Sequence, residues 1–154
     1  MAHHRDEPLT FDDVEVGDTW TSPARTITET DVVQFACLTG DLNPLHVDQE
    51  FARQTPFGKP IAHGLLGLSY VAGLGSHFPR MATLSFLRIL EWNFIKPIHF
   101  GDTVHVETEI LVKEPKARGR RGEITWKRSL VNQAGEVVQE GRTLTLVAGR
   151  AKED

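Results

Sequence analysis

The second half of the chain alternates apolar and polar residues with the two-residue period that is typical of β-strands. Four such segments lie at residues 82–98, 102–114, 122–133 and 136–149. The connections between them carry turn-forming or basic residues: Phe100–Asp102 (FGD), Pro115–Gly122 and Gln133–Gly135 (QAG). Four strands joined by such short connections predict an antiparallel meander, in which each strand pairs with the next one along the chain.

The first half of the chain shows the longer period of helices. A helix is predicted through residues 31–39, with Thr28 or Thr30 as its N-cap and Gly40 at its end. Its apolar residues share one broad face that we expect to be buried: Val32, Val33, Phe35, Ala36 and Leu38.

A proline interrupts the pattern after this helix. Pro44 disfavours a helix through the preceding residue, so Asp41–His46 is predicted to be a turn or loop. Asp48 is then expected to cap a short helix at residues 49–54.

Residues 63–78 form a segment that is apolar on nearly every side when drawn as a helix. It is rich in small residues: Gly64, Gly67, Ala72, Gly73 and Gly75. A helix that is apolar all round is buried, and small residues let other backbone approach it closely. With an edge strand expected at Val14–Trp20, the pattern predicts an α+β domain in which a curved antiparallel sheet wraps around a central buried helix.

The length of 154 residues suits one domain with a sizeable core. We assign residues 14–150 to that domain, residues 1–13 to a flexible leader and residues 151–154 to a polar tail. His3 and His4 are a tag remnant or native residues, and we give them little weight as metal ligands.

Charge and cysteine content argue against several function classes. The formal net charge of -4 does not favour nucleic acid as the main partner, because phosphate binding needs a concentrated positive field. The N-terminus lacks the apolar run of a signal peptide, and no stretch approaches the ~20 apolar residues of a membrane span. The single cysteine, Cys37, cannot form an internal disulfide, and we expect it to be a buried, inert thiol. A cytoplasmic protein without a membrane partner is expected.

The strongest candidate for an active site lies between the two long predicted helices. An acid, an amide and an imidazole (Asp41, Asn43 and His46) flank a proline, and His63 and Gly64 follow. A lone aspartate or histidine in a loop is more often a turn former or a structural residue. A turn, however, can bring the acid and the imidazole together over one water, where such a pair can transfer protons. The cluster as a whole is therefore the candidate site.

This segment resembles the signature of the MaoC-like, or R-specific enoyl-CoA hydratase, family. Thr39–His46 (TGDLNPLH) matches the family's small-residue-Gly-Asp-x-Asn-Pro-Leu-His core, and Ile61–Gly64 (IAHG) matches the Ile/Val-x-His-Gly step that follows it. The resemblance implies a hot-dog fold and the reversible hydration of trans-2-enoyl thioesters, usually of coenzyme A, to (R)-3-hydroxyacyl thioesters. It also implies a homodimer or a dimer of dimers.

By this resemblance, Asp41 and His46 are the catalytic pair and the backbone N–H of Gly64 is the oxyanion donor. An N–H in the first turn of a helix has no partner within the helix, and glycine leaves the approach to it open. Asn43 is expected to hold the loop or a water molecule. No metal ion or organic cofactor is required for this chemistry, beyond the coenzyme A that is part of the substrate.

The family pattern also raises a question about the pocket. Some members place a serine eight residues after the glycine that matches Gly64, and this chain has Ala72 there. The hydroxyl is thus absent or moved, with Ser69 as a candidate on a different side of the helix. We expect Leu65 and Ala72 to affect the depth of the substrate pocket.

Some residues allow two interpretations. His63 either contacts substrate or positions the loop, and the positioning role is favoured. The segment supplies too few ligands for a metal site. The basic residues around Pro115–Gly122 either bind the phosphates of coenzyme A or lie in a solvated hairpin loop, which is favoured. The three tryptophans are expected to pack in the core.

Three functions fit the sequence. The leading one is an enoyl-CoA hydratase or 3-hydroxyacyl-CoA dehydratase. A hot-dog acyl-CoA thioesterase is the second, and a non-catalytic subunit that binds acyl thioesters is the third. The Asp-x-Asn-Pro-x-His arrangement favours the hydratase.

Overall fold

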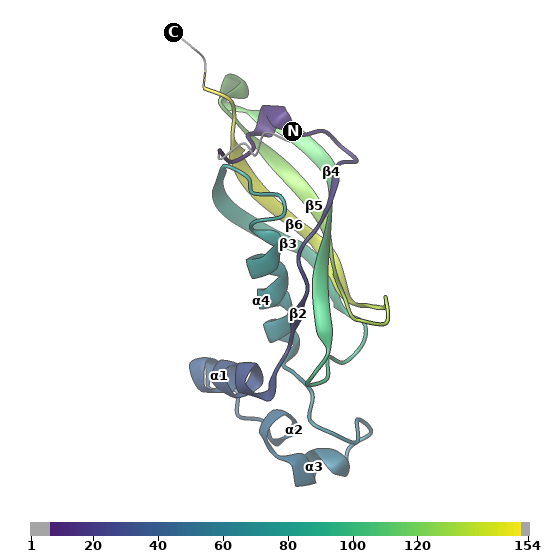
Figure 1. Ribbon diagram of the computed structural model, residues 1–154. Coiled ribbons are helices and arrows are strands. Elements are labelled where there is room, and N and C mark those ends of the chain that lie inside the picture. The colour runs from purple at the N-terminus through teal and green to yellow at the C-terminus, as the bar shows by residue number, and fades with distance from the viewer. Residues whose placement is uncertain (1–6, 152–154) are drawn as a thin grey trace.

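The computed structural model describes residues 7–151. A six-stranded sheet, antiparallel throughout, curves around helix α4 (Gly64–Gly75). Three shorter helices gather at the end where α4 begins (Figure 1): α1 (Glu29–Thr39), α2 (Pro44–Val47) and α3 (Gln49–Arg53). The predicted α+β class, with a sheet wrapped around a helix, is confirmed.

The sheet contains β1 (Thr19–Thr21), β2 (Arg25–Thr26), β3 (Thr83–Phe94), β4 (Thr103–Lys116), β5 (Arg121–Val131) and β6 (Val137–Ala148). The strand order is β1-β4-β5-β6-β3, and β2 also pairs with β4. The expected edge strand is present as β1, although it begins later than the sequence predicts.

The predicted four-strand meander is correct for β4, β5 and β6 but wrong for β3, which pairs with β6. The connection between β3 and β4 crosses the sheet instead of forming a hairpin. This connection also pairs with the segment before α4. The N–H of Ala62 donates to the carbonyl of Ile98 at 2.8 Å, and Ile61 forms a β-bridge with His99. β3 is therefore an end strand of the sheet.

The core has two parts, which follow one another along the inward-facing positions of β4 and β5. The larger part lies between α4 and the sheet and includes Val71, Val106 and Leu130. The smaller part surrounds Trp126, which packs edge-on against Trp20 with 6.2 Å between ring centroids. Trp92 packs against the larger part, so the expected packing role of the tryptophans is confirmed.

Helix α4 is buried on one face only. Leu66, Gly67, Val71 and Gly75 are its buried residues, and Leu65 is exposed on the outer side. The prediction of a helix enclosed on all sides is therefore wrong for the single chain. None of the described helices has the length and hydrophobicity needed to cross a membrane.

Helix α1 is also less buried than its pattern predicts. Val32 and Ala36 are buried, whereas Val33 and Leu38 are exposed. Cys37 is exposed too, which corrects the expectation of a buried thiol. The helix sits at one end of the domain, so only one narrow stripe of its surface meets the core (Figure 1).

Residues 9–13, which the sequence assigned to a flexible leader, are packed against the domain. Phe11, in the 3-10 helix η1 (Phe11–Asp13), is buried in the smaller core, and Leu9 pairs with Met81 in a β-bridge. The leader boundary is corrected accordingly. His3, His4 and residues 152–154 of the expected tail lie outside the described residues.

Asp13 links the two ends of the described chain and makes stability depend on pH. Its carboxylate accepts hydrogen bonds from the Thr10 hydroxyl at 2.6 Å and the Thr10 N–H at 2.8 Å, and it pairs with Arg150 at 2.6 Å. The two bonds from Thr10, followed by Arg150, hold the pKa of Asp13 well below its usual range. A lowered pKa in the folded state stabilises the fold above the unfolded pKa of 3.8, and this stabilisation is lost as the pH falls below that value.

Asp13→Asn removes the charge and keeps the size of the side chain. We expect a loss of about 1 kcal/mol at pH 7, which corresponds to roughly 2–4 °C in Tm for a chain of this size. Thermal denaturation of both proteins between pH 2 and pH 8 should show the two Tm values converging below about pH 4. A Tm difference that stays constant over the whole range would contradict this account.

Candidate active site

The end of α1 sets the position of Asp41. Thr28 is the N-cap, as its hydroxyl accepts a hydrogen bond from the N–H of Asp31, and Gly40 is the C-cap with a φ of 81°. Glycine adopts this left-handed conformation without steric cost, and its N–H donates to the carbonyl of Ala36 at 2.9 Å. The chain therefore turns out of the helix immediately before Asp41.

Pro44 starts helix α2 instead of preventing one. Proline is tolerated in the first turn, where its missing N–H would have no partner, and the Asn43 side chain caps the helix by accepting from the N–H of Leu45 at 3.0 Å. The predicted loop is thus wrong from Pro44 onward. The short helix carries His46 back toward Asp41.

His46 has a defined tautomer. Its Nδ1 lies 2.7 Å from the carbonyl oxygen of Ile61, and a carbonyl can only accept, so Nδ1 carries the hydrogen. In the neutral ring Nε2 then carries the lone pair and is the atom that can accept a proton.

His63 holds the other side of the cluster. It is buried, with 3% of its surface exposed, and its ring stacks on that of His46 with 3.8 Å between centroids. Nε2 donates to the backbone carbonyl of Asp41 at 2.9 Å, and Phe35 packs edge-on against the ring at 5.1 Å. These contacts support the loop-positioning role that the sequence favoured for His63.

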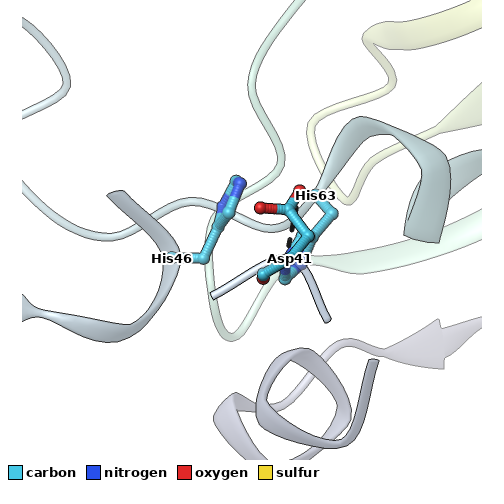
Figure 2. Close-up of side chains that lie close together, drawn as sticks. All are labelled: Asp41, His46 and His63. Atoms are coloured by element: carbon cyan, nitrogen blue, oxygen red, sulfur yellow. Dashed lines mark hydrogen bonds and ion pairs between the residues drawn. The ribbon is translucent and has the colours of Figure 1, made fainter. Parts of the chain in front are cut away.

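Asp41, His46 and His63 meet at the start of α4 (Figure 2), each with one side-chain N or O atom within 4.8 Å of the others. The Asp41 side chain is 55% exposed, so solvent and small molecules can reach its carboxylate. The stacked rings of His46 and His63 lie 27° from parallel. An accessible carboxylate beside an imidazole can take up and return protons, and the expectation that no metal ion is required stays a prediction.

Gly64, the first residue of α4, borders a mainly apolar cavity of about 320 Å³ next to this cluster. Its walls include Phe57, Ile61, Phe94, Ile98 and Gln139. A side chain at Gly64 would come within 2.9 Å of the Phe94 ring, which explains the glycine sterically. Backbone N–H groups in this first helical turn carry the positive end of the helix dipole.

The other predicted pocket residues lie apart from this cavity. Leu65 follows Gly64 but is exposed, and Ala72 is exposed further along α4. Ser69 lies in a separate groove between α1 and α4, where its hydroxyl donates to the carbonyl of Leu65 at 2.8 Å. The position of Ser69 therefore does not support the idea that its hydroxyl replaces the family's serine next to the cluster in the single chain.

Phe35, Phe94 and Gln139 contribute to the site, and no pattern in the sequence marks them as site residues. They come from α1, β3 and β6, and only the fold brings them near the His-Gly step. The basic hairpin between β4 and β5 lies at the opposite end of the sheet from α1–α3 (Figure 1). Its Lys116 pairs with Glu114 and Glu123, as expected of a solvated loop.

Comparison with known proteins places this geometry in a family. The family model described as the MaoC like domain matches residues 14–132, which is most of the chain. The chain belongs to the MaoC-like dehydratase family. The matched region contains the Asp41–His46 segment, the His63-Gly64 step and α4.

Individual members of the MaoC-like dehydratase family resemble this chain over nearly its whole length. A 3-hydroxybutyryl-CoA dehydratase of Methylorubrum extorquens is 36% identical, covering 95% of this chain and 88% of its own. An (R)-specific enoyl-CoA hydratase of Rhodospirillum rubrum is 34% identical, covering 91% and 92%. A solved structure named as a monoamine oxidase regulatory protein of Archaeoglobus fulgidus is 34% identical, with a TM-score of 0.86 over 94% of this chain and 97% of that one. The fold is that of MaoC-like hot-dog proteins.

Proposed function

We propose that this protein catalyses the reversible hydration of trans-2-enoyl-CoA thioesters to (R)-3-hydroxyacyl-CoA thioesters. The observation that carries the proposal is the meeting of Asp41 and His46 at the start of α4, beside the mainly apolar cavity at Gly64. The names of the Methylorubrum and Rhodospirillum relatives support the same reaction class.

In the hydration direction, a water molecule between Asp41 and His46 loses a proton to the pair. The oxygen bonds to C3 of the enoyl group while the C2=C3 electron pair moves toward the thioester, which places negative charge on its oxygen. The pair then gives this proton to C2 of the enolate, which restores both the thioester and the starting state of the pair. Because His46 Nδ1 donates to Ile61, Nε2 is the nitrogen that exchanges protons.

The N–H of Gly64 is the proposed donor to the thioester oxygen. A donor at a helix N-terminus is fixed before the reaction begins and adds the positive end of the helix dipole. The walls of the adjacent cavity are mainly apolar, and the lower local dielectric constant beside them strengthens this interaction. The acyl thioester would lie along that cavity with its C3 directed at the pair.

Crotonyl-CoA tests the reaction class directly. We expect loss of the enoyl absorbance without release of free thiol, and a product of R configuration on chiral analysis. Release of free thiol would instead identify a thioesterase, and binding without either change would identify a non-catalytic subunit.

We also propose that the protein forms a homodimer through β3. This strand is at the end of the sheet, so one of its edges has no partner strand among residues 7–151. Nearly every residue of β3 is exposed, including large apolar ones: Leu84, Phe86, Leu87, Ile89, Leu90 and Phe94. A long apolar edge strand promotes pairing with another chain, and two-fold pairing of β3 would cover it.

Ile89→Lys should weaken this dimer, because it places a charge on the apolar strand. Sedimentation equilibrium is expected to show a dimer for the unaltered protein and a shift to monomer for the variant, with the dissociation constant raised about tenfold or more. Val112→Lys is the matched control, since Val112 on β4 is equally exposed, at 46%, but lies away from the end strand. A monomeric unaltered protein, or an equal shift in both variants, would contradict the proposed interface.

A further inference from the structure

Both the nitrogen and the oxygen of the buried Gln139 amide form hydrogen bonds. It is 2% exposed, at the beginning of β6, in contact with the larger core. Its Nε2 donates to the backbone carbonyl of Gly64 at 3.0 Å, and its Oε1 accepts from the indole N–H of Trp92 at 3.1 Å. These bonds connect β3, β6 and the first turn of α4.

Two glycines make room for this connection. A Cβ at Gly67 would lie 2.3 Å from Gln139 Nε2 and 2.7 Å from Ile98 Cδ1. A Cβ at Gly141 would lie 2.1 Å from the backbone carbonyl oxygen of Glu91 and 2.7 Å from the Trp92 ring. A side chain at Gly67 would displace Gln139, so this glycine is required for the amide to reach α4, whereas Gly141 is required for the close approach of β6 to β3.

The first turn of a helix is its least restrained part, because its N–H groups have no partners within the helix. In α4 the N-cap residue, His63, makes no side-chain capping bond. Gln139 supplies a restraint from the sheet instead, by holding the carbonyl of the residue whose N–H faces the proposed reaction. A displacement of about 1 Å at such a site can lower the rate on the order of a hundredfold.

We propose that Gln139, oriented by Trp92, is a positioning residue that fixes Gly64 for stabilisation of the thioester oxyanion. The proposal rests on the proposed hydratase function. It predicts that changes at Gln139 lower kcat and leave KM nearly unchanged, because the donor acts mainly on the charge of the transition state.

The test compares Gln139→Leu and Gln139→Glu in the full chain with crotonyl-CoA as substrate. Leucine removes both hydrogen bonds and keeps the volume, and kcat should fall about tenfold or more. Glutamate still accepts from Trp92, but its ionised form cannot donate to Gly64. Its carboxylic acid form can donate, so the kcat of this variant relative to the unaltered protein should rise as the pH is lowered.

Thr145→Val is the matched control. Trp126 donates to Thr145 at 2.8 Å, so the variant also removes a buried indole hydrogen bond, but in the other part of the core. It should lower Tm while kcat stays within about twofold of the unaltered value. A fall in kcat of the same size in this control would mean that lost stability alone explains the effect of Gln139, and it would overturn the proposal.

Amide hydrogen exchange over residues 61–69 gives a readout that needs no activity. Exchange in the first turn of α4 should be faster in Gln139→Leu than in Thr145→Val. Unchanged exchange and unchanged kcat would each overturn the positioning role. Absence of hydration by the unaltered protein would reject the proposed function, while faster exchange in Gln139→Leu would still support the structural restraint.

Discussion

Asp41→Asn should lower kcat for crotonyl-CoA hydration by at least about a hundredfold, since general acid–base groups contribute typically 10²–10⁴-fold. Asparagine keeps the size of the side chain and an oxygen that can accept the bond from the N–H of Asn43 at 3.3 Å. The carbonyl of Asp41 that holds His63 belongs to the backbone and is unaffected. The variant therefore removes the carboxylate and leaves the turn intact.

Asp48→Asn is the control for this change. Asp48 lies seven residues further on, is exposed and caps α3, a role that asparagine fills equally well. We expect its kcat to stay within about twofold of the unaltered value. Initial rates at saturating substrate measure both variants, and near-normal kcat in Asp41→Asn would remove Asp41 from the proposed mechanism.

His46→Asn should lower kcat by a similar factor, because it removes Nε2 of the imidazole. The asparagine amide nitrogen can take the place of Nδ1 and keep the hydrogen bond to Ile61, but it offers nothing at the position of Nε2. The fold should therefore be retained while kcat falls about 10²–10⁴-fold. Circular dichroism and Tm check the fold, and rates across pH 5–9 check the loss of the imidazole.

The double variant separates joint action from independent action. If Asp41 and His46 activate the same water, the combined loss in Asp41→Asn with His46→Asn should be far smaller than the product of the single losses. His105→Asn, a histidine on β4 that pairs with Glu107 on the surface, should leave kcat unchanged. Multiplicative losses would mean that the two residues act in separate steps.

The parts of the site that sequence could predict are those set by neighbouring residues. Gly40 ends α1 and Asn43 caps α2, which carries His46, so the meeting of Asp41 and His46 follows from a few local conformations. Strand β5 can likewise be predicted from neighbouring residues alone, because its apolar and polar residues alternate as in a half-buried strand. The sequence does not predict the helix at Pro44, because proline has two opposite effects. It disfavours a helical conformation in the residue before it, but it also favours the start of a helix.

The remaining features depend on residues far apart in the chain. β3 carries the same alternating pattern whether it pairs with β4 or with β6, so periodicity alone predicts the strand but not its neighbour. Burial of α4 was overestimated because its apolar outer side has no cover within the described chain. The sequence pattern predicts only that Gln139 lies in a strand, and its contact with Gly64 depends on the fold.

The pairing of β3 with β6 also sets the order in which the molecule can be completed. During synthesis β3 emerges before its partner, and at 5–20 residues per second the end of β6 follows roughly 3–11 s later. Until then the larger core and the restraint on α4 from Trp92 and Gln139 are incomplete. The apolar residues of β3 are most open to aggregation in this interval, and the synthesis of β6 determines when the cavity at Gly64 can first be completed.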